Sequence, residues 1–283
     1  MIGRARTWLY VPAHRPELLA KAMAGDADAV VLDLEDAVPA AAKEAAREHA
    51  AAAVGAETPK PLWVRINQPG SAWAEADIAA LAGCGTGGVR VPKCADPAEA
   101  ARLAQRLGTP VHLLVESALG VENAFELARC HPSVVSVSLG EADLRADLRV
   151  SDPAGLDWAR ARIVNACRAA GLAGPPHAAW TDVSDVDGLV ADTERARDRG
   201  FFGRSVLHPT QINPVNAVFT PHEAEVAAAR ALLDSLRGRT ESGLAAWLDE
   251  RGRFIDPAVV AGASWLVERA DTVADTVTGG NNV

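Results

Sequence analysis

The sequence predicts an α/β fold, a (β/α)8 TIM barrel followed by a C-terminal helical lid extension. Short apolar runs alternate with longer helical patterns along most of the chain. Several of these runs are nearly continuous in Val, Leu or Ile, as in parallel strands buried on both faces. Eight such runs, each followed by a helical pattern, are typical of a barrel, and the 283 residues suffice for one, since single barrels reach about 250 residues. A doubly wound sheet is the alternative, but no Gly-x-Gly-x-x-Gly turn follows the first strand.

The expected strands are followed by helices with recognisable ends. In chain order the strands are 8–12, 29–34, 62–66, 88–92, 111–115, 134–139, a weaker segment at 175–179, and 202–207. Asp96 is a predicted N-cap residue, because Pro97 follows it and proline is favoured at the first position of a helix. Glycines stand where helix C-caps are expected, at Gly55, Gly108, Gly171 and Gly200.

The barrel pattern closes near Phe219, which predicts a catalytic barrel over residues 1–219 and an extension over 220–283. In the extension we expect a helix at about 223–236, a breaker stretch at 237–243 and a last helix from about 257 to 270. Asp256 lies just before that last helix. The residues on either side of it are apolar and need a surface against which to be buried. Asp256 is therefore either a helix cap or a functional residue on a lid.

Composition narrows the class of partner. The chain has 28 Lys and Arg against 37 Asp and Glu, a formal charge of −9, which argues against nucleic acid and anionic membranes. No apolar stretch approaches the roughly 20 residues of a membrane span, and the N-terminus does not resemble a signal peptide. The four cysteines have no metal-binding spacing. We expect a cytoplasmic protein with reduced thiols.

Charged and polar side chains follow the predicted strands. Because a TIM barrel builds its site at the carboxyl ends of its strands, these side chains should meet on one rim. In strand order they include Tyr10 and Arg15, then Asp33, Glu35 and Asp36, then Arg65, Lys93, Glu116, Asp143, and finally Ser205 and His208. Acids and bases on one rim suit a hard divalent cation together with an anionic substrate.

Glu116 and Asp143 are the candidate metal ligands. They lie 143 − 116 = 27 residues apart, about one β/α unit, so adjacent strands would present them side by side. Two carboxylates with open positions describe a Mg²⁺ site better than a zinc site. Alternatively such acids cap helices or pair with arginine, although Arg65 nearby favours a site.

For two further sets of residues, the sequence allows more than one role. The cluster Asp33, Glu35 and Asp36 could hold waters on the metal, or Asp36 could cap the next helix. His208 precedes proline at a helix start, where a structural role is the more frequent one.

Seven segments in order resemble the citrate lyase β-subunit-like branch of the HpcH/HpaI aldolase superfamily, which includes malyl-CoA, β-methylmalyl-CoA and citramalyl-CoA lyases. They are WLYVPAHRP (8–16), AVVLDLEDAV (29–38), VRIN (64–67), VPK (91–93), ESALG (116–120), GEADL (140–144) and LHPTQI (207–212). Two departures occur. The family's Gly-Ala-Glu-Asp is here Gly140-Glu141-Ala142-Asp143, and the usual glycine after Val-Pro is Ala13.

The resemblance implies a Mg²⁺-dependent lyase, with Mn²⁺ as a substitute, acting on a CoA thioester and a small 2-keto acid in a homo-oligomer, a trimer or hexamer. By motif, Glu116 and Asp143 match the metal ligands, Arg65 and Glu116 substrate contacts, and Tyr10, Arg15 and Lys21 the CoA side of the substrate. Asp256 resembles an acid/base aspartate that such lyases deliver from a lid onto a neighbouring subunit, which makes Asp256 and Arg65 the expected catalytic residues.

The expected reaction is reversible retro-Claisen cleavage of a 3-hydroxy-carboxyacyl-CoA to acetyl- or propionyl-CoA and glyoxylate or pyruvate. The alternatives are a malyl-CoA thioesterase, a citrate lyase β subunit acting on an acyl-carrier thioester, and a catalytically silent binding barrel.

Overall fold

The computed structural model describes residues 2–85, 87–240, 246–249 and 252–279. The chain divides into two compact units, Met1–Phe219 and Thr220–Val283.

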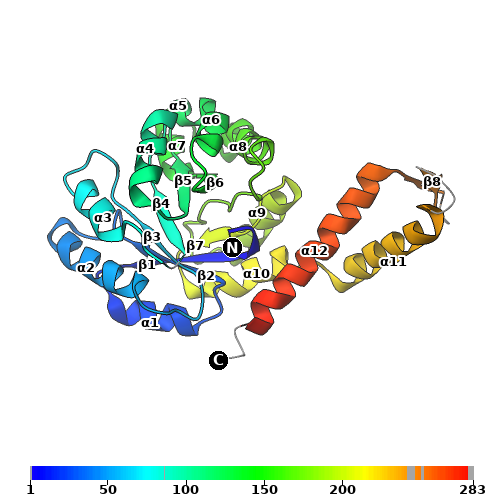
Figure 1. Cartoon of the computed structure of the whole chain (residues 1–283), viewed down its shortest axis with the longest axis horizontal. Helices are drawn as coiled ribbons and strands as arrows, with labels where there is room; N and C mark the ends of the chain where they lie inside the picture. The colour runs from blue at the N-terminus through cyan, green and yellow to red at the C-terminus, as the bar shows by residue number, and fades with distance from the viewer. Residues whose placement is uncertain (1, 86, 241–245, 250–251, 280–283) are drawn as a thin grey trace. The chain divides into compact units, whose positions relative to one another are not determined.

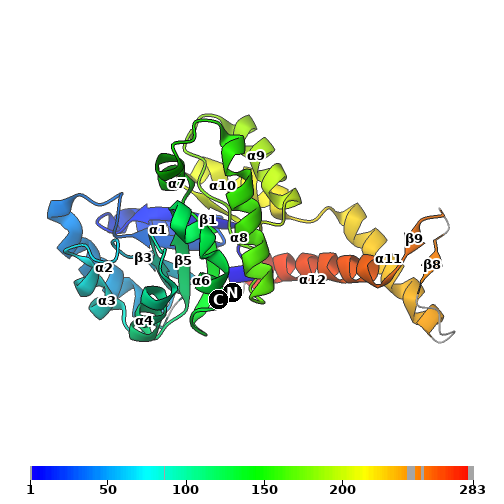
Figure 2. The ribbon, with the colours of Figure 1, turned by 90° about the horizontal axis from the view of Figure 1, so that it is seen from above.

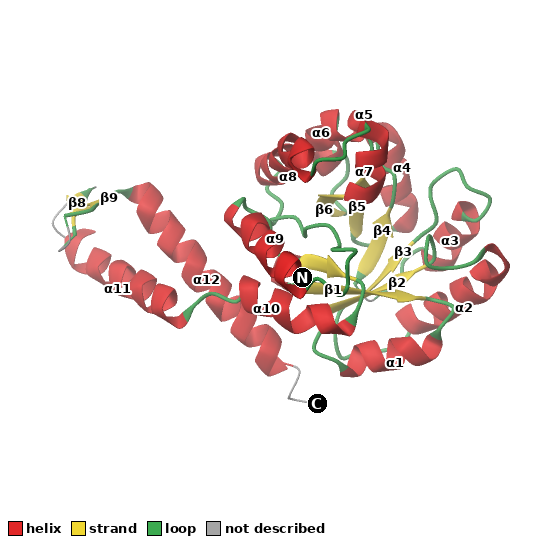
Figure 3. Cartoon of the chain, turned by 180° about the vertical axis from the view of Figure 1, so that it is seen from behind, coloured by secondary structure: helices red, strands yellow, loops and turns green. Residues whose placement is uncertain are grey.

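The first unit is an α/β barrel built on a curled sheet of seven parallel strands, which confirms the predicted fold class (Figures 1 and 3). In spatial order the strands are β6 (Val134–Leu139), β5 (Val111–Val115), β4 (Gly88–Val91), β3 (Leu62–Arg65), β2 (Ala29–Asp33), β1 (Thr7–Pro12) and β7 (Arg204–Val206). The helices lie around the outside of the sheet (Figure 1). They are α1 (Pro16–Ala24), α2 (Lys43–Val54), α3 (Ala74–Leu81), α4 (Pro97–Leu107), α5 (Ala118–Glu122), α6 (Ala124–Arg129), α7 (Glu141–Leu148), α8 (Asp157–Ala169), α9 (Val186–Asp198) and α10 (Ile212–Phe219).

The prediction of an eighth strand at 175–179 was wrong. Among the described residues, His177 makes one isolated parallel bridge to Arg204 of β7, and no ladder joins this segment to β6. Pro175 and Pro176 have no backbone N–H, so this stretch cannot donate the hydrogen bonds of a regular strand. The segment still lies beside β7 through this bridge.

Burial explains why the sequence forms these strands. Every residue of β2 and β5 is buried, as expected from their nearly continuous apolar runs. Inside the barrel, Trp8 and Trp63 pack edge to face with ring centroids 5.7 Å apart. The helix ends follow their predicted signals as well: Asp96 Oδ1 accepts from the N–H of Ala98 at 2.8 Å and caps α4. Local chemistry and core packing therefore specify the same barrel.

The second unit consists of α11 (Glu223–Thr240), the antiparallel strands β8 (Trp247–Leu248) and β9 (Phe254–Ile255), and α12 (Pro257–Gly279) (Figure 2). Both helices were expected, and both are longer than predicted. The small hairpin was not predicted. Helix α11 continues to Thr240 through the first part of the expected breaker stretch 237–243, and the rest of that stretch lies outside the described residues. None of the helices in the described part of the chain is long and apolar enough to cross a membrane.

Candidate active site

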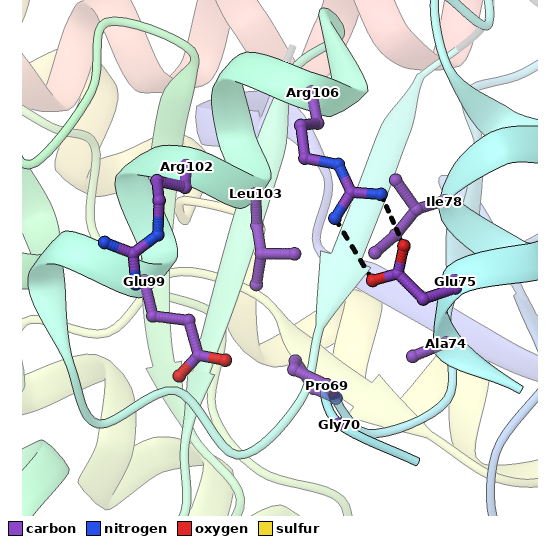
Figure 4. Close-up of a pocket in the computed structure, with 9 residues that line it drawn as sticks. All are labelled: Pro69, Gly70, Ala74, Glu75, Ile78, Glu99, Arg102, Leu103 and Arg106. Atoms are coloured by element: carbon purple, nitrogen blue, oxygen red, sulfur yellow. Dashed lines mark hydrogen bonds and ion pairs between the residues drawn. The ribbon is translucent and has the colours of Figure 1, made fainter. Parts of the chain in front are cut away.

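A cavity of about 390 Å³ opens at the carboxyl ends of the strands. The fold brings seven of the predicted rim residues into the lining of this one space: Tyr10, Asp33, Asp36, Arg65, Glu116, Asp143 and Ser205. A second hollow, of about 190 Å³, lies between α3 and α4 on the outside of the barrel (Figure 4). It contains a surface ion pair between Arg106 and Glu75 and none of the predicted site residues. The rim cavity is therefore the candidate site.

Arg65 ends β3 and is held by the acids that follow β2. Its Nε and Nη2 donate to the two oxygens of Asp33 at 2.7 and 2.8 Å. Its Nη1 lies 3.0 Å from Glu35 Oε2 and 3.1 Å from Asp36 Oδ2. The guanidinium carbon also lies 5.1 Å from the centroid of the Tyr10 ring. The acidic cluster thus has a role that neither interpretation from sequence included, because it fixes the orientation of Arg65.

Asp33 is itself anchored, which makes the arginine site rigid. Its two oxygens accept the backbone N–H groups of Glu35 at 3.0 Å and Ala37 at 2.9 Å. Glu35 is buried, and burial raises its pKa to about 7 although the charge of Arg65 acts in the opposite direction. The site therefore holds more carboxylates than Arg65 alone neutralises.

Glu116 follows β5 directly and is buried. Its Oε2 has no hydrogen-bond partner among the described residues. Burial, followed by the negative charges of Glu35 and Asp143, raises its pKa to about 8. A buried carboxylate oxygen without a partner costs free energy, so the geometry calls for a cation beside Glu116.

Asp143 lies in the first turn of α7, after β6, with an exposed side chain. Strands β5 and β6 pair in parallel, so the ends that carry Glu116 and Asp143 are neighbours, as the spacing predicted. Lys93 Nζ lies 3.5 Å from Asp143 Oδ1. In the described part of the chain, no group of three or more His, Cys, Asp or Glu side chains forms a metal site. Two carboxylates with the remaining positions open fit Mg²⁺, which keeps several waters when it binds proteins.

Glu141, the acid displaced from the family pattern, is used elsewhere. Arg160 Nε and Nη2 donate to its two oxygens at 2.8 and 2.6 Å, and His177 Nε2 lies 3.2 Å from Oε1. Burial acts against ionisation, but the hydrogen bonds from His177 and Arg160 outweigh it and lower the pKa of Glu141 to about 2. This carboxylate ties the loop after β6 to the segment at 175–179. No sequence signal pairs it with an arginine 160 − 141 = 19 residues away.

The remaining predicted residues lie outside the cavity lining. Arg15 forms an ion pair with Glu17, and Lys21 is exposed on α1. In the second unit, Asp256 Oδ1 accepts from the N–H of Val259 at 2.9 Å, so this aspartate caps α12. His208 Nδ1 accepts from the N–H of Thr210 at 3.3 Å in a helix cap, consistent with a structural role.

Gly140 permits the close approach of Glu116, and this leads to a prediction. A Cβ at position 140 would lie 2.5 Å from Glu116 Cγ and 2.6 Å from Oε1. We expect Gly140→Ala to displace the Glu116 carboxylate and weaken Mg²⁺ binding by about 10- to 100-fold, measured by titration calorimetry. Gly85→Ala is the matched control, because nothing lies within 4 Å of its Cβ position. Equal Mg²⁺ affinities for both variants would contradict the prediction.

Comparisons with known proteins agree with this geometry. A family model described as HpcH/HpaI aldolase/citrate lyase matches residues 6–209. A citrate lyase subunit beta-like protein of Mycobacterium tuberculosis is 37% identical over 271 residues, with 93% of this chain and 94% of that protein covered. An L-malyl-CoA/beta-methylmalyl-CoA lyase of Cereibacter sphaeroides is 31% identical over 307 residues, with 95% of each chain covered.

A solved structure gives the same result. The crystal structure of the protein CitE from Mycobacterium tuberculosis, in complex with magnesium, acetoacetate and coenzyme A, matches with a TM-score of 0.82 and 34% identity. The match covers 96% of this chain and all of that chain. The chain thus belongs to the HpcH/HpaI aldolase/citrate lyase family, as a lyase of the Mg²⁺-dependent citrate lyase β and malyl-CoA lyase type.

Proposed function

We propose that the protein catalyses reversible retro-Claisen cleavage of a 3-hydroxy-carboxyacyl-CoA such as malyl-CoA, β-methylmalyl-CoA or citramalyl-CoA. The products are acetyl- or propionyl-CoA and glyoxylate or pyruvate. One observation carries the proposal: a rigidly held arginine and a buried carboxylate without a hydrogen-bond partner face the same cavity at the strand ends. The proposed setting is the cytoplasm.

Glu116 and Asp143 are the residues that would hold Mg²⁺. When bound, the ion would polarise the hydroxyl and carboxylate oxygens at the keto-acid end of the substrate. The buried position of Glu116 supports this role, because a cation would satisfy its unpartnered oxygen. Mn²⁺ has the same preference for oxygen ligands and is the expected substitute.

Arg65 supplies the oriented positive charge for substrate oxygens. Asp33 takes one hydrogen from Nε and one from Nη2, and Nη1 faces Glu35 and Asp36, which leaves the second hydrogen of Nη2 for a substrate oxygen. Negative charge develops on the thioester enolate during cleavage, and a preorganised guanidinium in a dry site stabilises such charge by about 3 kcal/mol. The ion pairs with three acids hold the Arg65 guanidinium in place before substrate binds.

We assign the CoA side of the substrate to Tyr10, Arg15 and Lys21. Tyr10 lines the cavity, Arg15 is the N-cap residue of α1, and Lys21 lies in the last turn of α1. Both cations are exposed, which suits contact with the phosphates of CoA.

We further propose that residues 220–283 form a lid that delivers Asp256, as acid/base, to a neighbouring subunit of a homo-oligomeric trimer or hexamer. Apolar side chains of this unit support a docking role, because Phe254 is 63% exposed and Trp265 is 52% exposed. The capping hydrogen bond occupies one oxygen of Asp256 and agrees with a second, structural role.

One assay tests the proposed reaction. Purified protein is incubated with Mg²⁺, acetyl- or propionyl-CoA, and glyoxylate or pyruvate, and the condensation product is identified by mass. Release of free CoA with malate from malyl-CoA would instead show a thioesterase. Turnover restricted to acyl-carrier thioesters would show a citrate lyase β subunit. No turnover and no keto-acid binding would leave a silent binding barrel.

Arg65→Lys is expected to lower kcat by about 100-fold, because a lysine cannot reproduce the two parallel bonds to Asp33 and still face the substrate. The matched control is Arg106→Lys, which removes a similar two-bond pair with Glu75 on the outer surface (Figure 4). That control should keep wild-type kcat. An Arg65→Lys rate within about threefold of wild type, only ~0.7 kcal/mol, would refute the role.

A further inference from the structure

Arg90, on β4, is an arginine fully buried inside the barrel without a carboxylate partner in the described residues. Its Nη1 donates to Tyr10 Oη at 2.9 Å and to Ser205 Oγ at 3.1 Å. Its Nε and Nη2 have no hydrogen-bond partner among the described residues. The guanidinium carbon lies 4.6 Å from the centroid of the Trp8 ring and 5.5 Å from that of the Tyr10 ring. Aromatic rings and two hydroxyls are thus its main neighbours.

Packing alone does not explain an arginine at this position. A buried charge without a counter-ion is costly, and an apolar side chain of similar volume is usually at least as stable. Burial accordingly lowers the pKa of Arg90. The contrast with Arg204 is direct, since that side chain is 2% exposed and its Nη2 lies 2.8 Å from Asp192 Oδ2. Arg90 therefore has a role beyond stabilising the fold.

The two hydroxyls that Arg90 contacts belong to the active-site cavity. Tyr10 and Ser205 both line it, whereas Arg90 does not. A guanidinium can only donate hydrogen bonds, so the oxygens of Tyr10 and Ser205 must both act as acceptors towards Arg90. Each hydroxyl then keeps its own hydrogen for a different partner, and neither has another protein partner in the described part of the chain.

We propose that Arg90 is a positioning residue that makes Tyr10 and Ser205 hydrogen-bond donors to an oxygen of the bound 2-keto acid. The inference rests on the proposed function, because it assigns part of the keto-acid subsite, and it places the Tyr10 hydroxyl where the keto acid meets the CoA side of the substrate. Tyr10 also lies against Arg65, so the same contact holds the aromatic surface behind the catalytic guanidinium. Arg90 acts through these neighbours and does not itself touch substrate.

The test measures pyruvate binding to the Mg²⁺-loaded full chain by titration calorimetry. Tyr10→Phe and Ser205→Ala each remove one donor, and each should weaken pyruvate binding by about tenfold, as expected for a hydrogen bond to a charged acceptor. Arg90→Met should weaken binding by a similar factor. Added to the Tyr10→Phe/Ser205→Ala double variant, Arg90→Met should cause no further loss beyond twofold, because the groups through which it acts are already gone.

Thermal unfolding separates this role from a structural one. Arg90→Met should leave the melting temperature unchanged or raise it, since it removes an unpaired buried charge. Arg204→Met is the matched control and should lower the melting temperature, since it leaves Asp192 without its buried partner. If Arg90→Met does not fold, Arg90→Gln replaces it in the same cycle with the same expected losses, because the shorter side chain cannot reach both hydroxyls.

Three results would overturn the inference. The first is wild-type pyruvate affinity in both Tyr10→Phe and Ser205→Ala. The second is an equal loss from the Arg90 substitution in the wild-type and double-variant backgrounds, which would show that it acts independently of the hydroxyls. The third is a wild-type protein that binds neither pyruvate nor glyoxylate with Mg²⁺, which would disprove the proposed function and this inference with it.

Discussion

Glu116→Gln is expected to abolish turnover and to leave the barrel folded. The substitution keeps the shape of the side chain but removes the charge that would bind Mg²⁺. In the metal-free protein this charge lies close to Glu35 and Asp143, and together with burial they raise the pKa of Glu116 to about 8. A neutral amide relieves that repulsion, so we expect no loss of stability without metal. Asp143→Asn should likewise be inactive, because it removes the second ligand.

Thermal unfolding with and without Mg²⁺ measures the metal site independently of turnover. At 100 times its Kd, Mg²⁺ should add about 2.7 kcal/mol to the unfolding free energy of the wild type. The melting temperature of Glu116→Gln should not respond to Mg²⁺. Glu122→Gln, an exposed position on α5, is the control and should keep both the response and the turnover. Mg²⁺-dependent turnover retained in Glu116→Gln or Asp143→Asn would show that these carboxylates are not the ligands.

The fold could be predicted from sequence where periodicity and burial agree. The nearly continuous apolar runs at 29–34 and 111–115 became β2 and β5, whose residues are all buried. The strand predicted at 175–179 did not form, because the segment is apolar but its two prolines lack the N–H donors that a strand needs. The hairpin of β8 and β9 was missed because each strand has only two residues, too few for a period to show.

The sequence could predict which strand end carries each site residue, but it could not predict which side chains pair with one another. Spacing indicated that Glu116 and Asp143 follow neighbouring strands. It could not indicate that the acids after β2 close around Arg65, because that depends on side-chain directions across two strands. Arg90 shows the same limit: its charge is evident in the sequence, but only the packed barrel shows that no carboxylate of the described residues lies beside it.

Asp256→Asn is expected to lower turnover by about 10²- to 10⁴-fold with little change in stability. Asparagine caps a helix as well as aspartate does, so this variant keeps the hydrogen bond to the N–H of Val259 while removing the acid/base. Asp256→Ala is the companion variant and should add a stability loss of about 1 kcal/mol from the missing cap. If Asp256 only caps α12, Asp256→Asn will turn over at the wild-type rate.

Mixed oligomers test whether the aspartate acts on a neighbouring subunit. Each Asp256→Asn subunit has an intact metal site, and each Glu116→Gln subunit has an intact lid. If the lid of one subunit serves the barrel of another, mixing two inactive variants will create sites with a metal ligand from one chain and an acid/base from the other. Activity should therefore reappear as subunits exchange, and it should be absent from a mixture of Glu116→Gln with Asp143→Asn, where every barrel is defective. If mass spectrometry shows exchange and Asp256→Asn with Glu116→Gln stays inactive, then Asp256 does not act in trans.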